Sequence, residues 1–221
     1  MSSSREVIVA VTGHRLNQLP EGDRPRIKGE IERCLDAIET ASMELTHGRA
    51  RMTLRSAIAE GADRYAADAA LARLWRLVTP LPFEPERYEQ DFGGDRASIG
   101  HFNKLLHASR SVRAVSREEV EKIGGDAAPY AAVGRALVER ADLLICVWNG
   151  SPPRGPGGTS EVAALMLEKG GLVLWVAVGA PGVKLVGPAP LPRAGSFRRR
   201  LHEALSKIFE RAVRPPEMRM A

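Results

Sequence analysis

The chain has 221 residues, of which 44% are hydrophobic and 27% are charged. These values are close to the average of globular proteins, which excludes a chain disordered throughout, and the length predicts one large domain with at most a small appendage. The net charge is +5, but residues 184 to 221 alone carry nine Lys or Arg against three Glu, which argues against nucleic-acid binding by the rest of the chain.

The N-terminus and the cysteines predict a cytoplasmic protein. The first 15 residues, MSSSREVIVAVTGHR, contain no basic region followed by a small-residue cleavage site, so no export signal is expected. The longest apolar runs, 143–148 and 172–178, are well short of the ~20 residues that a membrane span requires. Cys34 and Cys146 are far apart in apolar stretches, as expected for reduced core thiols.

Apolar runs that suit strands alternate with amphipathic patterns that suit helices along most of the chain. This order is typical of βαβ units, and apolar runs without alternation are typical of strands buried on both faces. We therefore predict a Rossmann-like, doubly wound α/β fold with a mostly parallel sheet, helices on both faces and an added C-terminal amphipathic helix. Strands are predicted at 6–11, 52–58, 77–83, 111–115, 142–148 and 172–178, and helices at 26–42, 64–75, 99–106, 130–140 and up to residue 169.

Two stretches depart from this alternation. Pro80 and Pro82 fall in the third strand, where the missing N–H predicts a strand end or an edge position. Residues 181–195 are rich in proline and glycine and are predicted to link a domain of residues 1–180 to a basic helix and tail of residues 196–221. The apolar side of this helix is expected to dock on the body or on a second subunit. It consists of Phe197, Leu201, Leu205, Ile208 and Ala212.

Polar and glycine-rich residues gather after three of the predicted strands. They are Thr12-Gly13-His14-Arg15 after the first strand, Glu60-Gly61-Ala62-Asp63 after the second and Gly155 to Glu161 after the fifth. In an open parallel sheet, ligands bind outside the carboxyl ends of the strands, where the strand order reverses. We therefore expect these loops to form one ligand site.

The third loop has the features of a phosphate-binding loop. Gly157 and Gly158 allow the backbone to approach a ligand, and Thr159 and Ser160 could cap the following helix, whose free N–H groups and positive dipole end favour an anion. The alternative is an ordinary loop and helix cap. The sequence lacks G-x-G-x-x-G after its first strand and lacks G-x-x-x-x-G-K-[ST], which argues against a dinucleotide-dependent dehydrogenase and a P-loop NTPase.

Charged side chains in these loops suggest further ligand contacts. Arg15 could donate two hydrogen bonds to the same phosphate, and His14 is either a ligand contact or a structural hydrogen-bonding group. Glu60 and Asp63 could accept sugar hydroxyls, although one of them is expected to be a helix cap. Glu161 lies in the first turn of its helix, where an acid is favoured in any case, and could also contact a sugar hydroxyl.

Aromatic and histidine residues give weaker indications. Tyr88, Asp91 and Phe92 could form a wall that holds a base, but aromatic residues in such positions more commonly fill the core. The histidines show no metal-ligand grouping with cysteines or carboxylates, so neither a metal site nor a cofactor is expected. No nucleophile motif such as G-x-S-x-G is present.

Five segments occur in a recognisable order, namely VAVTGHR, AIAEGADRYAADAAL, LPFEPERYEQDF, YAAVGRALVERADLLICVWNG and GGTSEVAALMLEKGGLVLWVAV. Together they resemble the SLOG superfamily, a Rossmann-like group that contains the LOG-type phosphoribohydrolases, the DNA-processing protein A fold and nucleotide-sensor domains of bacterial defence systems. The resemblance is closest to the sensor members. It implies that the chain binds a nucleotide or an ADP-ribose-like signal, forms a homo-oligomer and reports to a separate effector protein.

The resemblance places the family's ligand loops on the three loops described above, with two departures. Where sensor-like members commonly have Trp-Asp-Gly, this chain has Asn149 between Trp148 and Gly150, which removes a carboxylate at the mouth of the site. Glu161 follows Thr159 by two residues, whereas the acid of LOG enzymes follows by three. One residue on a helix is about 100° of rotation, so Glu161 need not face where a hydrolytic glutamate would.

Three functions are compatible with these observations. The first is a sensor or ligand-binding module that holds a nucleotide through its phosphate. The second is a LOG-like phosphoribohydrolase that cleaves the N-glycosidic bond of nucleoside 5′-monophosphates, with Glu161 as its catalytic residue. The third is nucleic-acid binding through the basic C-terminal helix, against which the apolar stripe of that helix argues. The two departures favour the first function over an enzyme.

Overall fold

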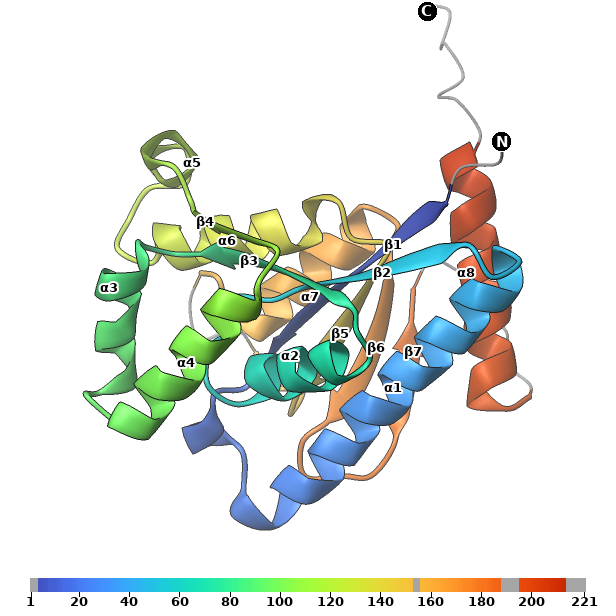
Figure 1. The fold of residues 1–221 in the computed structure, drawn as a ribbon, viewed down its shortest axis with the longest axis horizontal. Coiled ribbons are helices and arrows are strands. Elements are labelled where there is room, and N and C mark those ends of the chain that lie inside the picture. Colours follow the sequence, from blue (N-terminus) through green and yellow to red (C-terminus); the bar gives the residue numbers. More distant parts are fainter. Residues whose placement is uncertain (1–3, 153–155, 188–194, 214–221) are drawn as a thin grey trace, which may run out of the picture.

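A seven-stranded sheet forms the centre of the molecule (Figure 1). The computed structural model describes residues 4–152, 156–187 and 195–213. Residues 211–213 are described by their backbone alone. The strand order is β4-β3-β2-β1-β5-β6-β7, and all neighbours are parallel except β6 and β7. This arrangement confirms the predicted α/β, doubly wound fold. The strands are β1 (Arg5–Gly13), β2 (Ala50–Arg55), β3 (Arg76–Leu81), β4 (Ser111–Ala114), β5 (Leu143–Trp148), β6 (Leu172–Ala177) and β7 (Val183–Val186).

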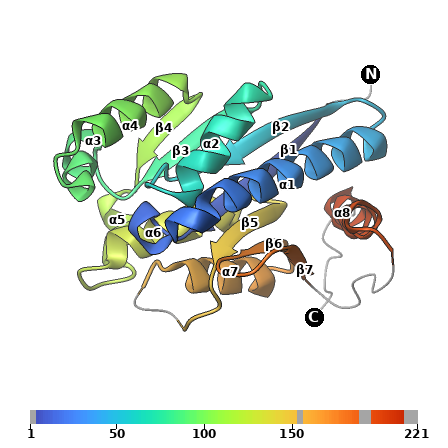
Figure 2. The same cartoon turned by 90° about the horizontal axis from the view of Figure 1, so that it is seen from below.

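Helices cover both faces of this sheet (Figure 2). One face carries α1 (Arg24–Leu45), α2 (Ala62–Ala72), α4 (Arg96–Ala108) and α8 (Phe197–Val213), and the other carries α6 (Ala128–Glu139) and α7 (Thr159–Glu168). The short helical segments are η1 (Leu16–Gln18), η2 (Glu21–Asp23), α3 (Pro85–Tyr88), η3 (Glu89–Phe92) and α5 (Arg117–Glu121). Within the described residues, no helix is long and apolar enough to cross a membrane.

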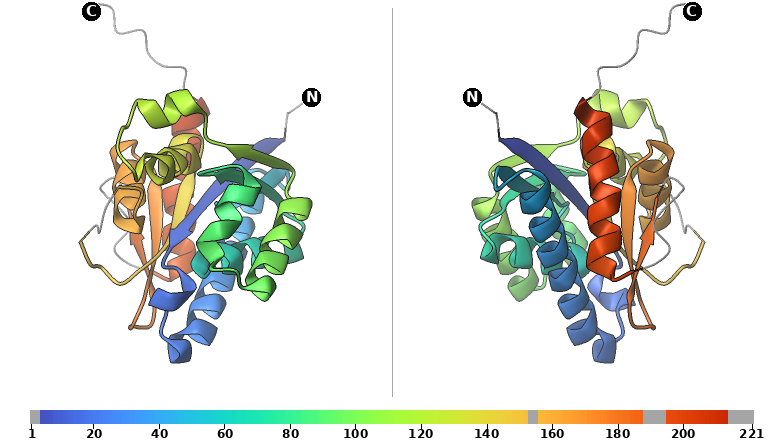
Figure 3. Two further views of the ribbon diagram at one scale, coloured as in Figure 1. Left: turned by 90° about the vertical axis from the view of Figure 1, so that its left-hand side faces the viewer. Right: turned by 90° about the vertical axis from the view of Figure 1, so that its right-hand side faces the viewer.

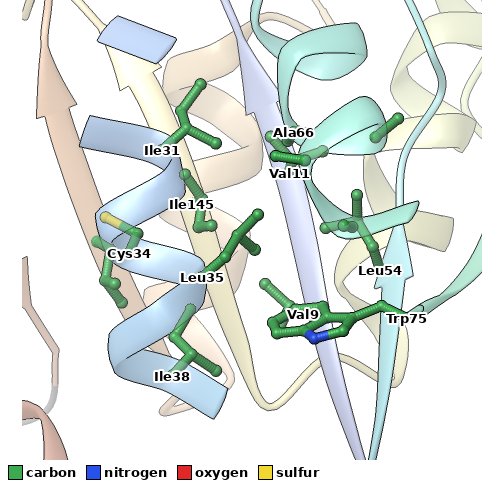
Figure 4. Close-up of a cluster of buried hydrophobic side chains, with 14 of the residues drawn as sticks. Val9, Val11, Ile31, Cys34, Leu35, Ile38, Leu54, Ala66, Trp75 and Ile145 are labelled. Carbon is green, nitrogen blue, oxygen red and sulfur yellow. The ribbon is translucent and has the colours of Figure 1, made fainter. Parts of the chain in front are cut away.

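The continuous apolar sequence of β1 follows from burial on both sides. Val9 and Val11 face α1 and α2, whereas Ala10 faces α6 and α7, and all three are fully buried. Figure 4 shows Leu35 and Ile38 of α1 in the same buried cluster as Val9 and Val11 of this strand. The apolar positions of α1 recur at helical spacing, so one face of the helix is buried as predicted.

The third strand lies inside the sheet, so the predicted edge position is wrong, whereas the predicted strand end is correct. Val78 is the last residue of β3 that pairs with β2, and its carbonyl accepts the N–H of Ser56. Alternate residues of a strand direct their backbone groups to the same neighbouring strand, so Pro80, two residues after Val78, also faces β2. Its nitrogen lies beyond the last hydrogen bond between β2 and β3. The missing N–H of Pro80 therefore removes no ladder hydrogen bond.

The second strand ends earlier than predicted, at Arg55 instead of residue 58. Ile58 has a φ of 48°, which a strand cannot accommodate, and its N–H donates to the Ser56 hydroxyl. The chain therefore turns directly after β2. A side-chain hydrogen bond to the backbone competes with the strand ladder at this point.

The predicted linker of residues 181–195 contains a strand, which corrects that prediction. Strand β7 pairs antiparallel with β6, and its Val183 and Leu185 pack against the core. Residues 188–194 of the predicted linker lie outside the described residues, as do Gly155 of the third loop and the side chain of Ala212.

The C-terminal helix docks on the body of the protein. Helix α8 lies beside α1, as the right-hand view of Figure 3 shows, and Leu201 and Leu205 are fully buried in the main core. Phe209 adds a further contact, because the Arg5 guanidinium lies 3.9 Å from its ring centroid. Of the two docking partners predicted for the apolar side, the body is therefore the one observed.

Leu205→Ala should lower the free energy of unfolding by about 3 kcal/mol, because it leaves a cavity between α8 and α1. Leu74→Ala is the matched control, since Leu74 is 93% exposed, and it should change stability by less than about 0.5 kcal/mol. Urea denaturation measures both values. Equal effects of the two substitutions would show that α8 does not dock in solution.

Candidate functional site

A cleft of about 760 Å³ opens at the carboxyl ends of the central strands. It is bounded by the loops that follow β1, β2, β3 and β5. Because β1 connects to β2 on one side and pairs with β5 on the other, this is the point where the strand order reverses, the position at which such sheets bind ligands. The predicted site residues that line the cleft are Thr12, Gly13, His14, Arg15, Asp63, Asn149, Gly157, Gly158, Thr159 and Ser160.

Three predicted site residues do not line the cleft, and each has a structural role. Gly61 precedes α2 with a φ of 92°, and a Cβ there would lie 2.6 Å from the carbonyl oxygen of His14. Glu60 accepts a hydrogen bond from the hydroxyl of Ser98, at the start of α4. Glu161 accepts the N–H of Gly157 at 2.6 Å and thereby closes its own loop.

The N-terminus of α7 is open to the cleft. Its N-cap is Gly158, which has no side chain, so the predicted capping by Thr159 and Ser160 is wrong. These two residues form the first turn, and no described residue accepts a hydrogen bond from their N–H groups, whereas those of Glu161 and Val162 donate to the Gly158 carbonyl. Unbonded N–H groups and the positive end of the helix dipole together favour an anion.

Arg15 supplies a fixed positive charge to the same cleft. Its guanidinium donates to Asp91 at 3.2 Å, and Asp91 also accepts the hydroxyl of Tyr130 at 2.7 Å. Burial alone would lower the pKa of Arg15, but the nearby Tyr88, Asp91 and Tyr130 raise it above its ordinary value. Arg15 is therefore charged and held in place, with its side chain still partly exposed.

The three residues proposed as a base wall take different roles. Phe92 is buried in the core against Phe102 and the ring of Tyr88, as the core-packing alternative predicts. Tyr88 is also buried, yet it lines the cleft. Asp91 does not line the cleft and instead holds Arg15 and Tyr130, a role that the sequence did not indicate.

Asp63 is the buried carboxyl of the cleft. It lies in the first turn of α2 and is 5% exposed, and the backbone N–H groups of Ala57 and Ala59 lie near its carboxyl and favour the charged form. Burial raises the pKa of Asp63 to about 7, against the opposing effects of those N–H groups, Arg15 and Arg64. A carboxyl in a cleft with a strongly raised pKa is typical of functional sites.

Apolar side chains that the sequence analysis did not select form another wall. Tyr130, Val133 and Leu137 come from α6, and Trp148 ends β5. The position of Trp148 at the carboxyl end of a predicted strand was a usable signal, whereas the inward side of α6 depends on how that helix packs. The ring of Trp148 lies 5.5 Å from that of Trp175, whose indole N–H donates to the Trp148 carbonyl at 2.8 Å.

Two further polar features bear on the chemistry of the cleft. Asn149 uses its side-chain oxygen to accept the N–H of Ser151 at 3.0 Å, which shapes the loop after β5. Among the residues that the structure describes, no three His, Cys, Asp or Glu side chains are placed to hold a metal ion. The cleft thus combines a cationic, hydrogen-bond-donating side with an apolar side.

Comparisons with known proteins concern the fold. No protein-family model matches the chain, and no curated protein matches its sequence. The chain is similar to the Moco carrier protein of Chlamydomonas rheinhardtii, with 16% identity and a TM-score of 0.39 over 77% of this chain and 76% of that one. It is similar to DNA processing protein A of Streptococcus pneumoniae, with 15% identity and a TM-score of 0.45 over 93% of this chain and 56% of that one.

The chain is also similar to DNA processing protein A of Helicobacter pylori, with 14% identity and a TM-score of 0.43 over 76% of this chain and 64% of that one. All three similarities are between chains that share at most 16% of their residues. At this level of identity they say nothing about the ligand of this chain.

Asp63→Asn should make the protein more stable at pH 8 by an amount on the order of 3 kcal/mol, because the wild type must then hold a buried carboxylate. Because the pKa of Asp63 is raised to about 7 in the folded state, the folded protein keeps a proton on this carboxyl up to about pH 7, whereas the unfolded chain loses it near about pH 4. The wild type therefore loses stability as the pH rises from about 4 to 7, and the variant lacks this loss.

Denaturant unfolding of both proteins at a series of pH values measures this difference. Asp126→Asn, at an exposed position, is the matched control and should leave the pH dependence of the wild type unchanged. Parallel pH profiles for the wild type and Asp63→Asn would contradict a raised pKa at Asp63.

Proposed function

We propose that this chain is a sensor or ligand-binding module that binds a nucleotide or a nucleotide-derived molecule, such as a nucleoside phosphate or an ADP-ribose-like ligand, in the cleft. The observation that carries the proposal is the open N-terminus of α7, where the N–H groups of Thr159 and Ser160 have no acceptor among the residues that the structure describes. Arg15 lines the same cleft and supports a phosphate there by charge.

The two sides of the cleft suit the two parts of such a ligand. The phosphate would bind at the start of α7, and the base would lie against Tyr130, Leu137 and Trp148. The cleft volume is within the range of small-molecule sites, which combine apolar walls with a few polar groups. Glycine at position 158 keeps the helix end accessible.

Binding without cleavage is favoured over the phosphoribohydrolase alternative. Glu161, the catalytic residue in that alternative, already accepts the N–H of Gly157 and does not line the cleft. Nucleic-acid binding by α8 is disfavoured, because its apolar side packs on the body. A cytoplasmic location, predicted from the N-terminus and the cysteines, also belongs to the proposal. The family resemblance adds a homo-oligomer, a separate effector protein and a role in bacterial defence.

Thermal unfolding with AMP, ADP, ATP, ADP-ribose, NAD and cyclic nucleotides tests the proposal, since a ligand that binds only the folded state stabilises it by mass action. At least one compound should raise Tm by several degrees and be recovered intact by chromatography. Released base would instead support the phosphoribohydrolase. The absence of any shift across the panel would contradict the proposal.

Two variants locate the bound molecule. Ser160→Glu places a carboxylate at the anion position and should abolish the shift, and Arg15→Ala should reduce it, each relative to the unliganded variant. Arg117→Ala is the matched control, because Arg117 is exposed on α5 away from the cleft. A shift that survives Ser160→Glu would place the ligand elsewhere.

A further inference from the structure

The proposed phosphate site leaves one charged group of the cleft without a function, the carboxyl of Asp63. Asp63 lines the cleft from the start of α2. When ionised it has the opposite charge to Arg15 and the same charge as a phosphate. An acid that serves only as a helix cap has no need to be buried in the lining of a ligand cleft. Its 5% exposure means that neither water nor salt screens it effectively.

The groups that face Asp63 do not neutralise it fully. Arg15 from the loop after β1, Arg64 from α2 and Tyr88 from α3 are close enough to interact with it electrostatically. Arg15 is hydrogen-bonded to Asp91, and Arg64 donates to the carbonyls of Ile58 and Ser98 and to the Ser98 hydroxyl. Among the described residues, no salt bridge joins Asp63 to either arginine.

An anion in this cleft would therefore meet a buried group of its own sign. Two like charges in a poorly screened site repel one another, and the repulsion is relieved when one of them takes up a proton. We propose that the cleft binds its anionic ligand together with a proton, and that Asp63 is the group that holds this proton. This inference rests on the proposed function and adds a regulation of the same site by pH.

The pKa of Asp63, raised by burial to about 7, supports the inference, because the proton is then taken up near neutral pH. An anion close by should raise that pKa further. By linkage, the affinity for the anion must then fall as the pH rises above the pKa of the empty site, by up to about tenfold per pH unit while one proton is taken up.

Sulfate is a suitable probe, because it is a tetrahedral dianion that does not itself titrate near neutral pH. NMR of the full chain would follow the side-chain carboxyl carbon of Asp63 through a pH titration, with and without sulfate, and would follow the amide signals of Thr159 and Ser160 as the measure of binding. The Asp63→Asn variant lacks this carboxyl, so the signal missing from its spectrum identifies Asp63. The same variant serves as the protein that cannot take up a proton at this position. Asp36, an exposed carboxyl of α1 outside the cleft lining, serves as the internal control.

The expected result has two parts. Sulfate should move the titration of Asp63 to higher pH, while the carboxyl signal of Asp36 does not respond to sulfate. The affinity of the wild type for sulfate should fall at least several-fold between about pH 6 and 8, and that of Asp63→Asn should change much less. His14 also lines the cleft, but any effect of its imidazole would persist in Asp63→Asn.

Other outcomes separate the two proposals. If sulfate shifts the amides of Thr159 and Ser160 but leaves the titration of Asp63 unchanged, the inference is wrong and the anion site stands. A carboxyl that titrates as an ordinary exposed aspartate would also overturn it. If sulfate leaves both amides unchanged at every pH, the anion site itself is wrong, and the proposed function falls with it.

Discussion

At the carboxyl end of β1, three segments of the chain approach so closely that no side chain fits between them. A Cβ on Gly13 would lie 2.6 Å from that of Ala62 and 2.7 Å from that of Val147, and a Cβ on Gly61 would meet the backbone of residues 14 to 16. Contacts this short require glycine at both positions. The loops after β1 and β2 are consequently locked against each other and against β5, and this contact fixes the positions of Arg15 and Asp63.

The opposite wall of the cleft is built on the same principle. Gly157 has a φ of 78°, and a Cβ there would lie 2.6 Å from the backbone of Tyr130, so the loop before α7 rests directly on the start of α6. A Cβ on Gly134 would lie 2.8 Å from Val162, so the two helices also cross closely. The proposed anion position at the start of α7 is thus held by these close contacts and by the hydrogen bond from Gly157 to Glu161, and a ligand would find it already formed.

The sequence was a good guide where one local rule decided the structure. Continuous apolar runs located β1, β5 and β6, because strands buried on both faces need no polar residues. Polar and glycine-rich residues after β1, β2 and β5 located most of the cleft, because parallel strands bring their carboxyl ends to one edge. These predictions needed no knowledge of how distant residues pack.

Tertiary packing decided the features that were missed. Strand β7 is short and flanked by glycine and proline, and it forms because Val183 to Val186 can pair with the free edge of β6. Asp91 holds Arg15 and Tyr130, which lie 76 and 39 residues away in sequence, so no local pattern indicates it. The Glu161 carboxylate accepts the N–H of Gly157, because the loop before α7 brings this N–H within hydrogen-bonding distance.

The contact between Trp148 and Trp175 has an optical consequence. Of the three tryptophans of the chain, Trp75 is buried in the core, whereas Trp148 lines the cleft and is joined to Trp175 through its carbonyl. A molecule that covers Trp148 changes the polarity around that ring, while the surroundings of Trp75 stay the same. The intrinsic fluorescence of the protein therefore carries a built-in report of occupancy, with Trp75 as its constant background.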